Sequence, residues 1–493
     1  MDRMETVTTG EMKAPVAGIN PPVGMRVAPP VLTKESRKMQ ENFQIFGVTT
    51  FLYAFFYAFC MYKNNAGVTY PLFVIASLLY IRYCMKQLEV LRKKGTIFYE
   101  ISMVLLGIST FCTADSRIIA MNKLGVFLLT MAMILFNTYE TKKWGLTKYL
   151  AAMLQSIVMA IGEMARPFSD AASYCKRKMG QRSKKVLYVV LSVAVSIPVV
   201  CIIFALLISA DAVFHKMSIG LLENINLSNI VGVIFKAVIM FFIAYGILSY
   251  LCKKSIKEEV ADKVKKESLL AIPMVGMLSV LYLVFSVIQI AGLFLGKLEL
   301  PEGYSYAAYA REGFFQLLIV SILNLVIVLA GMHFFRKSKV LDVLLTFMSL
   351  CTFIMIASSA MRMILYIRMY NLTFSRIFVL WVLFVLTLLF IGVIVNLYKK
   401  QFPLFGYCIV VITLCYLVLS FSHPDYLIAK YNMEKAKDAI TVDYQYLYSL
   451  NEDAAPVLKK YLTEEQAENI WYGYQKKSIR KFNVSRYIAG RLF

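Results

Sequence analysis

The stretch IFVLWVLFVLTLLFIGVIVNL, residues 377–397, decides the fold class of this chain. It contains no charged side chain, and a helix of this length covers about 30 Å, the thickness of the hydrocarbon core of a membrane. Arg376 precedes the stretch, and Lys399 and Lys400 follow it. Residues 377–397 therefore predict a transmembrane helix.

Ten other stretches share this pattern, so the sequence predicts an all-α, polytopic bundle of about eleven transmembrane helices within residues 43–421. The composition agrees, because a hydrophobic fraction of 59% and a mean hydropathy of +0.64 exceed what a soluble domain carries. The predicted spans are Phe43–Tyr62, Val68–Tyr83, Ile97–Ala114, Ile119–Tyr139, Val186–Ser209, Ile230–Leu251, Leu270–Leu295, Phe314–Phe335, Val340–Leu365, Ile377–Leu397 and Leu404–Phe421.

Basic residues gather on alternate sides of these spans. With a cytoplasmic N-terminus, the inward segments carry 32 Lys and Arg, the outward loops with their adjoining helix ends carry 9, and the C-terminal tail carries 11. The positive-inside rule favours this orientation in the plasma membrane, and an odd span count places the tail outside. Long terminal domains cross a membrane largely regardless of their charge, so the basic tail weakens the argument only slightly.

The two ends of the chain differ in kind. Residues 1–42 are rich in proline and polar residues and have no apolar core, which predicts a disordered cytoplasmic leader rather than a signal peptide. Residues 422–493 are polar and carry repeated helix-start signals, among them Asp425, Asp453 and the capping box of Thr463 and Gln466. They predict a small external helical domain, whose aromatic side chains pack between helices or bind a ligand.

The loop 140–185 contains one apolar stretch at helical spacing, from Tyr149 to Met164. Its apolar run is short for a span and is flanked by lysines, which favours a helix lying in the cytoplasmic interface. Packing on the bundle rather than on lipid is an alternative. A true span at this place would change the topology.

The sequence gives little sign of chemistry. Nine cysteines lie mostly in spans and three histidines are scattered, so we expect no metal site and no disulfide framework. A phosphate-binding loop and an HExxH motif are both missing, so we assign no catalytic residue and no cofactor. The net charge of +23 lies mostly in loops beside the spans, which indicates anionic lipid head groups as partners rather than nucleic acid.

Several motifs resemble a known group of membrane proteins. SYAAYAREGFFQLLIVSILNLVIVL (305–329), HPDYLIAKYNMEKA (423–436), VDYQYLYSLNEDAAPVL (442–458), LISADAVFHKM (207–217) and FNVSR (482–486) look like the bacterial multipass proteins catalogued as domain of unknown function 4173. The related 4153 group is similar as well. The resemblance implies a polytopic fold and no known activity.

Four charged residues form a candidate external polar cluster. Asp211 follows the fifth predicted span, Arg311 and Glu312 precede the eighth, and Lys236 lies inside the sixth. Such residues form an external polar site or hold helices in register. Lys236 either pairs with Asp211 or Asp115, or extends its ammonium towards the interface.

These features favour a non-enzymatic cell-envelope protein that senses or acts as a scaffold, with a protein partner that the sequence does not identify. The alternative is a small-molecule or lipid transporter, because Pro71, Pro198 and Pro273 interrupt spans. A polar cavity reaching the middle of the membrane would favour transport. A close-packed bundle capped by the C-terminal domain would favour the envelope role.

Overall fold

The computed structural model describes residues 32–141, 144–178, 227–254, 256, 266–291, 306–399, 401–436, 443–461 and 479–492, with scattered positions between 192 and 214. Within these ranges the chain is helical and holds no β-strand beyond an isolated bridge, which confirms the all-α prediction there. The longer helices are α1 (Lys34–Glu41), α2 (Phe43–Met61), α3 (Thr69–Gln87), α4 (Thr96–Cys112), α5 (Ser116–Thr138), α6 (Leu146–Gly162), α7 (Arg166–Lys178), α10 (Leu227–Cys252), α11 (Ala271–Gln289), α12 (Tyr306–Phe334), α13 (Lys339–Tyr370), α14 (Phe374–Tyr398), α15 (Leu404–Phe421), α16 (Pro424–Ala436) and α20 (Val484–Leu492). The short elements are η2 (Ser268–Leu270), α17 (Tyr444–Tyr448), η4 (Glu452–Ala454), α18 (Ala455–Leu458) and η5 (Ile479–Lys481).

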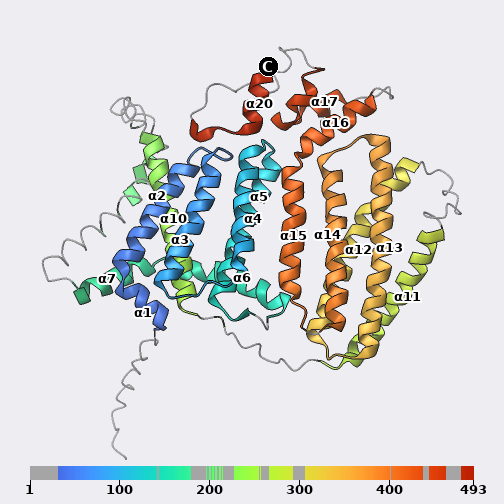
Figure 1. The fold of residues 1–493 in the computed structure, drawn as a ribbon, viewed down its shortest axis with the longest axis horizontal. Helices are drawn as coiled ribbons and strands as arrows, with labels where there is room; N and C mark the ends of the chain where they lie inside the picture. Colours follow the sequence, from blue (N-terminus) through green and yellow to red (C-terminus); the bar gives the residue numbers. More distant parts are fainter. Residues whose placement is uncertain are drawn as a thin grey trace, which may run out of the picture.

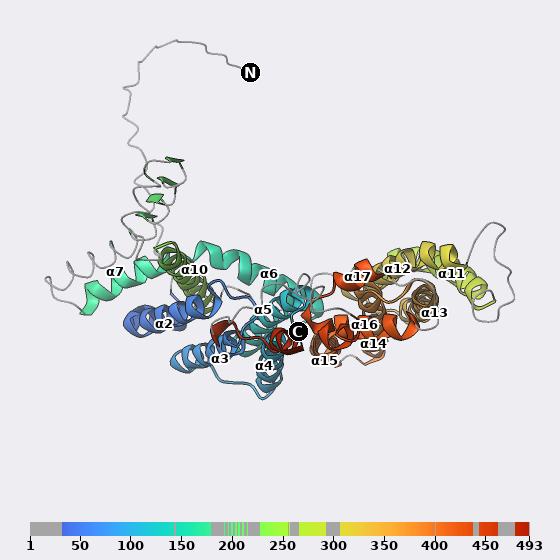
Figure 2. The ribbon, with the colours of Figure 1, turned by 90° about the horizontal axis from the view of Figure 1, so that it is seen from above.

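The long helices stand side by side in two halves (Figures 1 and 2). The first half contains α2 to α5 and α10, and the second half contains α11 to α14. Helix α15 lies between them and contributes to both cores, through Tyr416 and Leu417 to the first and through Leu404 and Cys408 to the second. Because the halves share α15, a change at its ends reaches both of them.

Eight helices are long and apolar enough to cross a membrane, by length and composition: α2, α5, α10, α11, α12, α13, α14 and α15. The predicted spans 68–83 and 97–114 correspond to α3 and α4, which run alongside the others (Figure 1) but are not among the eight. Helix α4 has only 17 residues, and α3 carries Arg82 and Lys86 near its end. Most of the predicted span 186–209 lies outside the described residues, so the count of eleven is not confirmed.

Helices α6 and α7 lie across one end of the bundle, which we call the N-terminal side; Figure 2 shows them lengthwise while the long helices are seen end on. Tyr149, Ala152 and Ala160 of α6 are buried in a cluster with the bundle. Leu154 and Val158, on another face of the helix, are exposed apolar side chains. Helix α6 thus packs on the bundle through one face and leaves another apolar face exposed, and its position in the membrane interface stays a prediction.

The leader prediction needs a correction at its end, because residues 34–41 form α1. Thr33 caps this helix and also donates a hydrogen bond to the Cys252 carbonyl at 2.5 Å. Glu35 forms an ion pair with Lys254 at 2.8 Å, so α1 is fastened to the end of α10. The predicted boundary at residue 42 is therefore wrong by about two turns, since the tertiary contacts that order α1 involve residues more than 200 positions away.

The described parts of the C-terminal region, 424–436, 443–461 and 479–492, cover the opposite end of the bundle (Figure 1), and we call them the cap. Residues from α16 to α18 form a small core, and Phe374 and Ile377 of α14 pack against it. The capping box of Thr463 and Gln466 and the predicted stripe of Ile470, Trp471 and Tyr474 lie outside the described residues.

Candidate functional site

Three carboxylates are buried where the cap meets the bundle. Asp115 caps α5, Asp425 lies in the first turn of α16, and Asp453 lies in η4. The exposed fractions of these residues are 1%, 2% and 4%. A buried carboxylate is costly unless it is paired or hydrogen-bonded, so the partners of these three groups define the site.

Arg117 joins the first two acids. Its guanidinium makes two hydrogen bonds to Asp115, at 2.9 and 2.8 Å, and one to Asp425 at 2.5 Å. It also lies 3.9 Å from the ring centre of Phe374, at the start of α14. One cation thus links α5, the cap and the second half. The Arg117 side chain is 41% exposed, so solvent screens part of this attraction.

Asp425 uses its other oxygen inside the cap. The Asn451 backbone N–H and side-chain amide both donate to it, at 3.2 and 2.6 Å. Burial raises the pKa of Asp425 above its ordinary value, Arg117 opposes this rise, and the negative charge of Asp115 adds to it. Burial thus favours the protonated form of Asp425 more than in a solvated aspartate.

Asp453 is held by donors from two other segments. Thr113 Oγ1 and the Ala114 N–H, both in the turn between α4 and α5, donate to it at 2.5 and 2.9 Å. The Nδ1 atom of His423, a residue between α15 and α16, lies 3.4 Å from Asp453 Oδ2, the oxygen that also accepts from Thr113. Burial favours a higher pKa for Asp453, but the hydrogen bonds, that of His423 first among them, outweigh burial and lower the pKa. The same contact raises the pKa of His423.

The last residues of the cap hold the first half. Asn483 donates to the carbonyls of Ala66 and Thr113 at 3.0 and 2.9 Å, and Ser485 donates to the Cys112 carbonyl at 3.0 Å. The Arg480 guanidinium donates to the Tyr62 carbonyl at 2.9 Å. These bonds satisfy carbonyl groups at helix ends, where the backbone has no intrahelical donor.

Helix α16 holds the second half in the same way. Asn432 both accepts from the Leu372 N–H at 2.7 Å and donates to the Leu372 carbonyl at 2.9 Å. Lys435 donates to the Arg368 carbonyl at 2.5 Å. Leu372 lies in the turn between α13 and α14, so the cap is bonded to loops of both halves.

A polar network continues from this site into the seam between the halves. Asn122 of α5 is fully buried and accepts hydrogen bonds from Tyr416 and Ser420 of α15, both at 2.7 Å. Its amide donates to Ser109 of α4 at 3.2 Å. Three helices are therefore fixed in register directly beneath the acid cluster, because a buried polar group held by several partners specifies one arrangement.

The predicted external cluster has a different fate. Lys236 donates to the Met61 carbonyl at 3.1 Å, and Asp211 accepts from the Phe214 N–H at 2.5 Å. Lys236 lies on α10 and Arg311 on α12, which occupy opposite halves (Figures 1 and 2), so the structure does not bring these two together. The side chains of Arg311 and Glu312 lie outside the described residues. A pair between Asp211 and Lys236 stays a prediction.

Asp115, considered from the sequence as a partner of Lys236, binds Arg117 instead. Asp425 and Asp453 were recognised only as helix-start signals, and nothing in their local sequence shows that they converge. A signal that did exist is the density of polar residues in HPDYL and NEDAAP, the two short segments that contain Asp425 and Asp453.

Arg362 is a second feature that the sequence did not reveal. It lies inside α13, is only 8% exposed, and donates to Gln289 of α11 at 3.2 Å. A Cβ atom added to Gly313 of α12 would lie 2.1 Å from Arg362 Nη1. The glycine of the YAREGF segment thus leaves room for a guanidinium between three helices.

The hydrogen bonds and ion pairs of the acid cluster hold segments of the fold together. The oxygens of Asp425 and Asp453 accept hydrogen bonds from other segments, whereas those of Asp115 accept from Arg117 at the start of the same helix. Within the part of the chain that the structure describes, no group of three His, Cys, Asp or Glu side chains is placed to hold a metal ion.

Comparison with known proteins identifies the family. Residues 101–461, most of the chain and all of α5 to α18, match the family model described as domain of unknown function (DUF4153). A relation to the 4173 group, which the motifs also suggested, is not shown. No curated protein and no solved structure matches the chain significantly. This chain belongs to the DUF4153 family and, with its eight apolar helices, is an integral membrane protein.

Proposed function

We propose that this protein is a non-enzymatic cell-envelope protein whose external cap senses or organises the envelope and fastens the two membrane halves together. The observation that carries the proposal is Asp453, which lies in the cap and accepts hydrogen bonds from the turn that starts α5. Whatever pulls on or binds the cap acts on this turn directly.

Helix α5 provides the route across the membrane. It begins at the Asp115 cap, and near its other end Asn137 accepts hydrogen bonds from the Lys93 N–H at 3.0 Å and from Thr96 Oγ1 at 2.8 Å. Lys93 lies in the connection between α3 and α4 on the N-terminal side, and Thr96 is the first residue of α4. A rigid helix that is bonded at both ends transmits a shift of its first turn to this connection.

The placement of the ends supports the proposed orientation. Helix α1 lies on the N-terminal side and the cap lies on the other (Figure 1), as an odd number of crossings requires. The exposed basic side chains Lys176 and Arg177 of α7 also lie on the N-terminal side, where the positive-inside rule expects them to face the cytoplasm.

Hydrogen exchange of the full chain in lipid nanodiscs tests this proposal. Asp453→Asn removes the charge that the donors hold, whereas Asp443→Asn changes an exposed helix-capping residue of the same segment and is the matched control. We expect Asp453→Asn to speed exchange in 443–461 and 479–492 and also around Lys93 and Thr96. An effect confined to the cap would contradict sensing, and no effect at all would contradict the fastening.

The transporter alternative can be compared with a cavity in the first half of the bundle. That cavity has a volume of about 450 Å³ and lies between α2, α3, α5 and α10. Its walls are mainly Leu, Ile, Val, Met, Phe and Tyr side chains, which suit a lipid chain better than a polar solute. Transport of small polar molecules therefore gains no support from it.

A further inference from the structure

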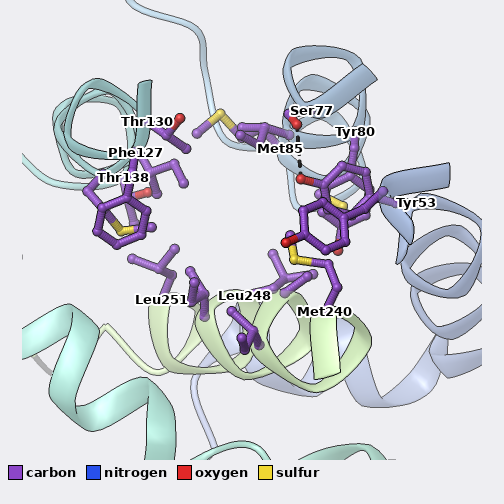
Figure 3. Close-up of a pocket in the computed structure, with 18 of the residues that line it drawn as sticks. Tyr53, Ser77, Tyr80, Met85, Phe127, Thr130, Thr138, Met240, Leu248 and Leu251 are labelled. Atoms are coloured by element: carbon purple, nitrogen blue, oxygen red, sulfur yellow. Dashed lines mark hydrogen bonds between the residues drawn. The ribbon is translucent and has the colours of Figure 1, made fainter. Parts of the chain in front are cut away.

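The cavity of the first half is a slot that runs along the membrane-spanning direction. Its lining includes Lys123 and Thr138 of α5, which lie four turns apart and so about 22 Å along the helix axis. Figure 3 shows Phe127, Thr130 and Thr138 facing Ser77 and Tyr80 across an open space. A slot of this length spans most of the hydrocarbon core of about 30 Å.

Several hydroxyl groups in the walls have hydrogen-bond partners within the protein. Tyr53 OH lies 2.9 Å from Ser77 Oγ, and Thr130 Oγ1 donates to the Val126 carbonyl at 2.7 Å. Tyr80 OH lies 2.7 Å from Thr50 Oγ1. These hydroxyl groups thus have partners without any water or solute in the slot, and most of the other lining side chains are apolar. Protein interiors are close-packed, so an apolar space of this size in a membrane is suited to a hydrocarbon chain.

The two ends of the slot carry different charges. At the N-terminal side, Glu35 and Lys254 line the slot and neutralise each other in an ion pair of 2.8 Å. At the cap side, Lys123 lines the slot, and its Nζ lies 5.7 Å from the centre of the Tyr70 ring. Lys123 lies on α5 and Lys236 on α10, two helices that both line the slot.

Lys236 lies next to the slot. Its Nζ bonds to the carbonyl of Met61, and Met61 and Met240 both line the slot. Neither Lys236 nor Lys123 forms an ion pair with any residue in the described ranges. Two ammonium groups at the edge of a hydrocarbon region repel each other, and an anion between them relieves this repulsion.

We propose that this slot binds an anionic phospholipid, with one acyl chain along α5 and α10 and the phosphate between Lys123 and Lys236. The apolar walls select a chain and the two lysines select a negative head group. Charge complementarity places the head group in the leaflet on the cap side, since the other end of the slot is neutral.

The test uses the full-length protein purified in detergent, with bound lipids counted by native mass spectrometry. The probes are phosphatidylglycerol, phosphatidylcholine and inorganic phosphate. We expect phosphatidylglycerol to bind roughly tenfold more tightly than phosphatidylcholine or more, and inorganic phosphate not to displace it. Equal affinity for the two lipids, or displacement by inorganic phosphate at millimolar concentration, would overturn the proposal.

Variants separate the head group from the chain. Lys123→Gln with Lys236→Gln should abolish the preference for phosphatidylglycerol and leave phosphatidylcholine binding unchanged. Lys430→Gln, on an exposed position of α16, is the control for loss of a charge on the cap side. Ala244→Leu, which fills the slot from α10, should weaken binding of both lipids. An unchanged preference in the lysine variant, or unchanged binding in Ala244→Leu at an unaltered Tm, would show that lipid binds elsewhere.

Discussion

Thr113 Oγ1 donates a hydrogen bond of 2.5 Å to Asp453 Oδ2, although 340 residues separate the two in the chain. Thr113 ends α4, and Asp453 belongs to the cap. The bond therefore joins segments separated by more than two thirds of the sequence, and the adjacent Ala114 N–H donates to the other oxygen of the same carboxylate at 2.9 Å. Because one buried carboxylate makes both of these hydrogen bonds, we expect a single substitution of Asp453 to weaken the contact between the cap and the bundle.

Asp453→Asn should destabilise the protein by roughly 2–3 kcal/mol, because hydrogen bonds to a charged group are lost and an amide N–H₂ is placed against the Ala114 N–H. Thermal unfolding of the purified protein in detergent measures this as a lower Tm. Asp443→Asn keeps a residue that caps helices as well as aspartate does, so its Tm should stay unchanged. Equal Tm values for the two variants would contradict the role of Asp453.

The contact between His423 and Asp453 predicts a dependence of stability on pH. The pKa of His423 is raised above its ordinary value of 6.5 by the hydrogen bond to Asp453, against the effect of burial. The folded state thus binds this proton more tightly than the unfolded chain, so the stabilisation is complete below pH 6.5 and is lost as the pH rises through the folded pKa.

We expect the Tm of the wild-type protein to fall between pH 6 and pH 9, and His423→Gln to remove most of this slope. The lowered pKa of Asp453 acts elsewhere, since its contribution is lost only as the pH falls below its ordinary value of 3.8. Measurements of Tm at several pH values, in one detergent and at constant ionic strength, check the prediction. A slope that His423→Gln leaves intact would assign the effect to another group.

The sequence predicts much of the membrane part and little of the site. The charge-free run 377–397 becomes α14, and the all-α class holds in every described range, since an apolar stretch of about twenty residues has few alternatives in a membrane. The acid cluster depends on contacts between segments more than 300 residues apart, such as Arg117 with Asp425. No local sequence pattern shows which turn of the membrane helices a residue of the cap will contact.

The same reason explains the errors at single residues. Arg362 was not recognised from the sequence as a buried group, but the small residue Gly313 admits it to the space between α11, α12 and α13. Residues 34–41 were expected to be disordered, but Thr33 and Glu35 find partners at Cys252 and Lys254. In both cases the contacting residue lies in another part of the chain, which the local sequence does not identify.

Topology gives a prediction that is independent of the cap contacts. A reporter enzyme that is active only outside the membrane should work when fused after Phe493 and should fail when inserted at Lys257, because basic loops stay in the cytoplasm. Cells expressing each fusion at equal levels provide the measurement. Activity at Lys257 without activity after Phe493 would mean that the stretch beginning at Tyr149 spans the membrane, against the crosswise position of α6 in Figure 2.

The packing of Arg362 against Gly313 predicts an unusual cost for a small substitution. In Gly313→Ala the new Cβ would lie 2.1 Å from Nη1 and 3.0 Å from Cζ of Arg362, so the guanidinium must leave its bond to Gln289. We expect a loss of about 1–3 kcal/mol. Gly276→Ala in α11 is the control: nothing lies within 4 Å of its Cβ position, and alanine favours a helix, so the Tm should stay equal or rise.

A double-mutant cycle shows whether the guanidinium is the cause. Arg362→Lys replaces the planar fork with a slimmer ammonium, so Gly313→Ala should cost clearly less in the Arg362→Lys background than in the wild type. The Tm of the four proteins, measured in the same detergent, gives the coupling. The same penalty in both backgrounds would mean that Gly313 is needed for helix contact in general, and that the close approach of Arg362 is incidental to it.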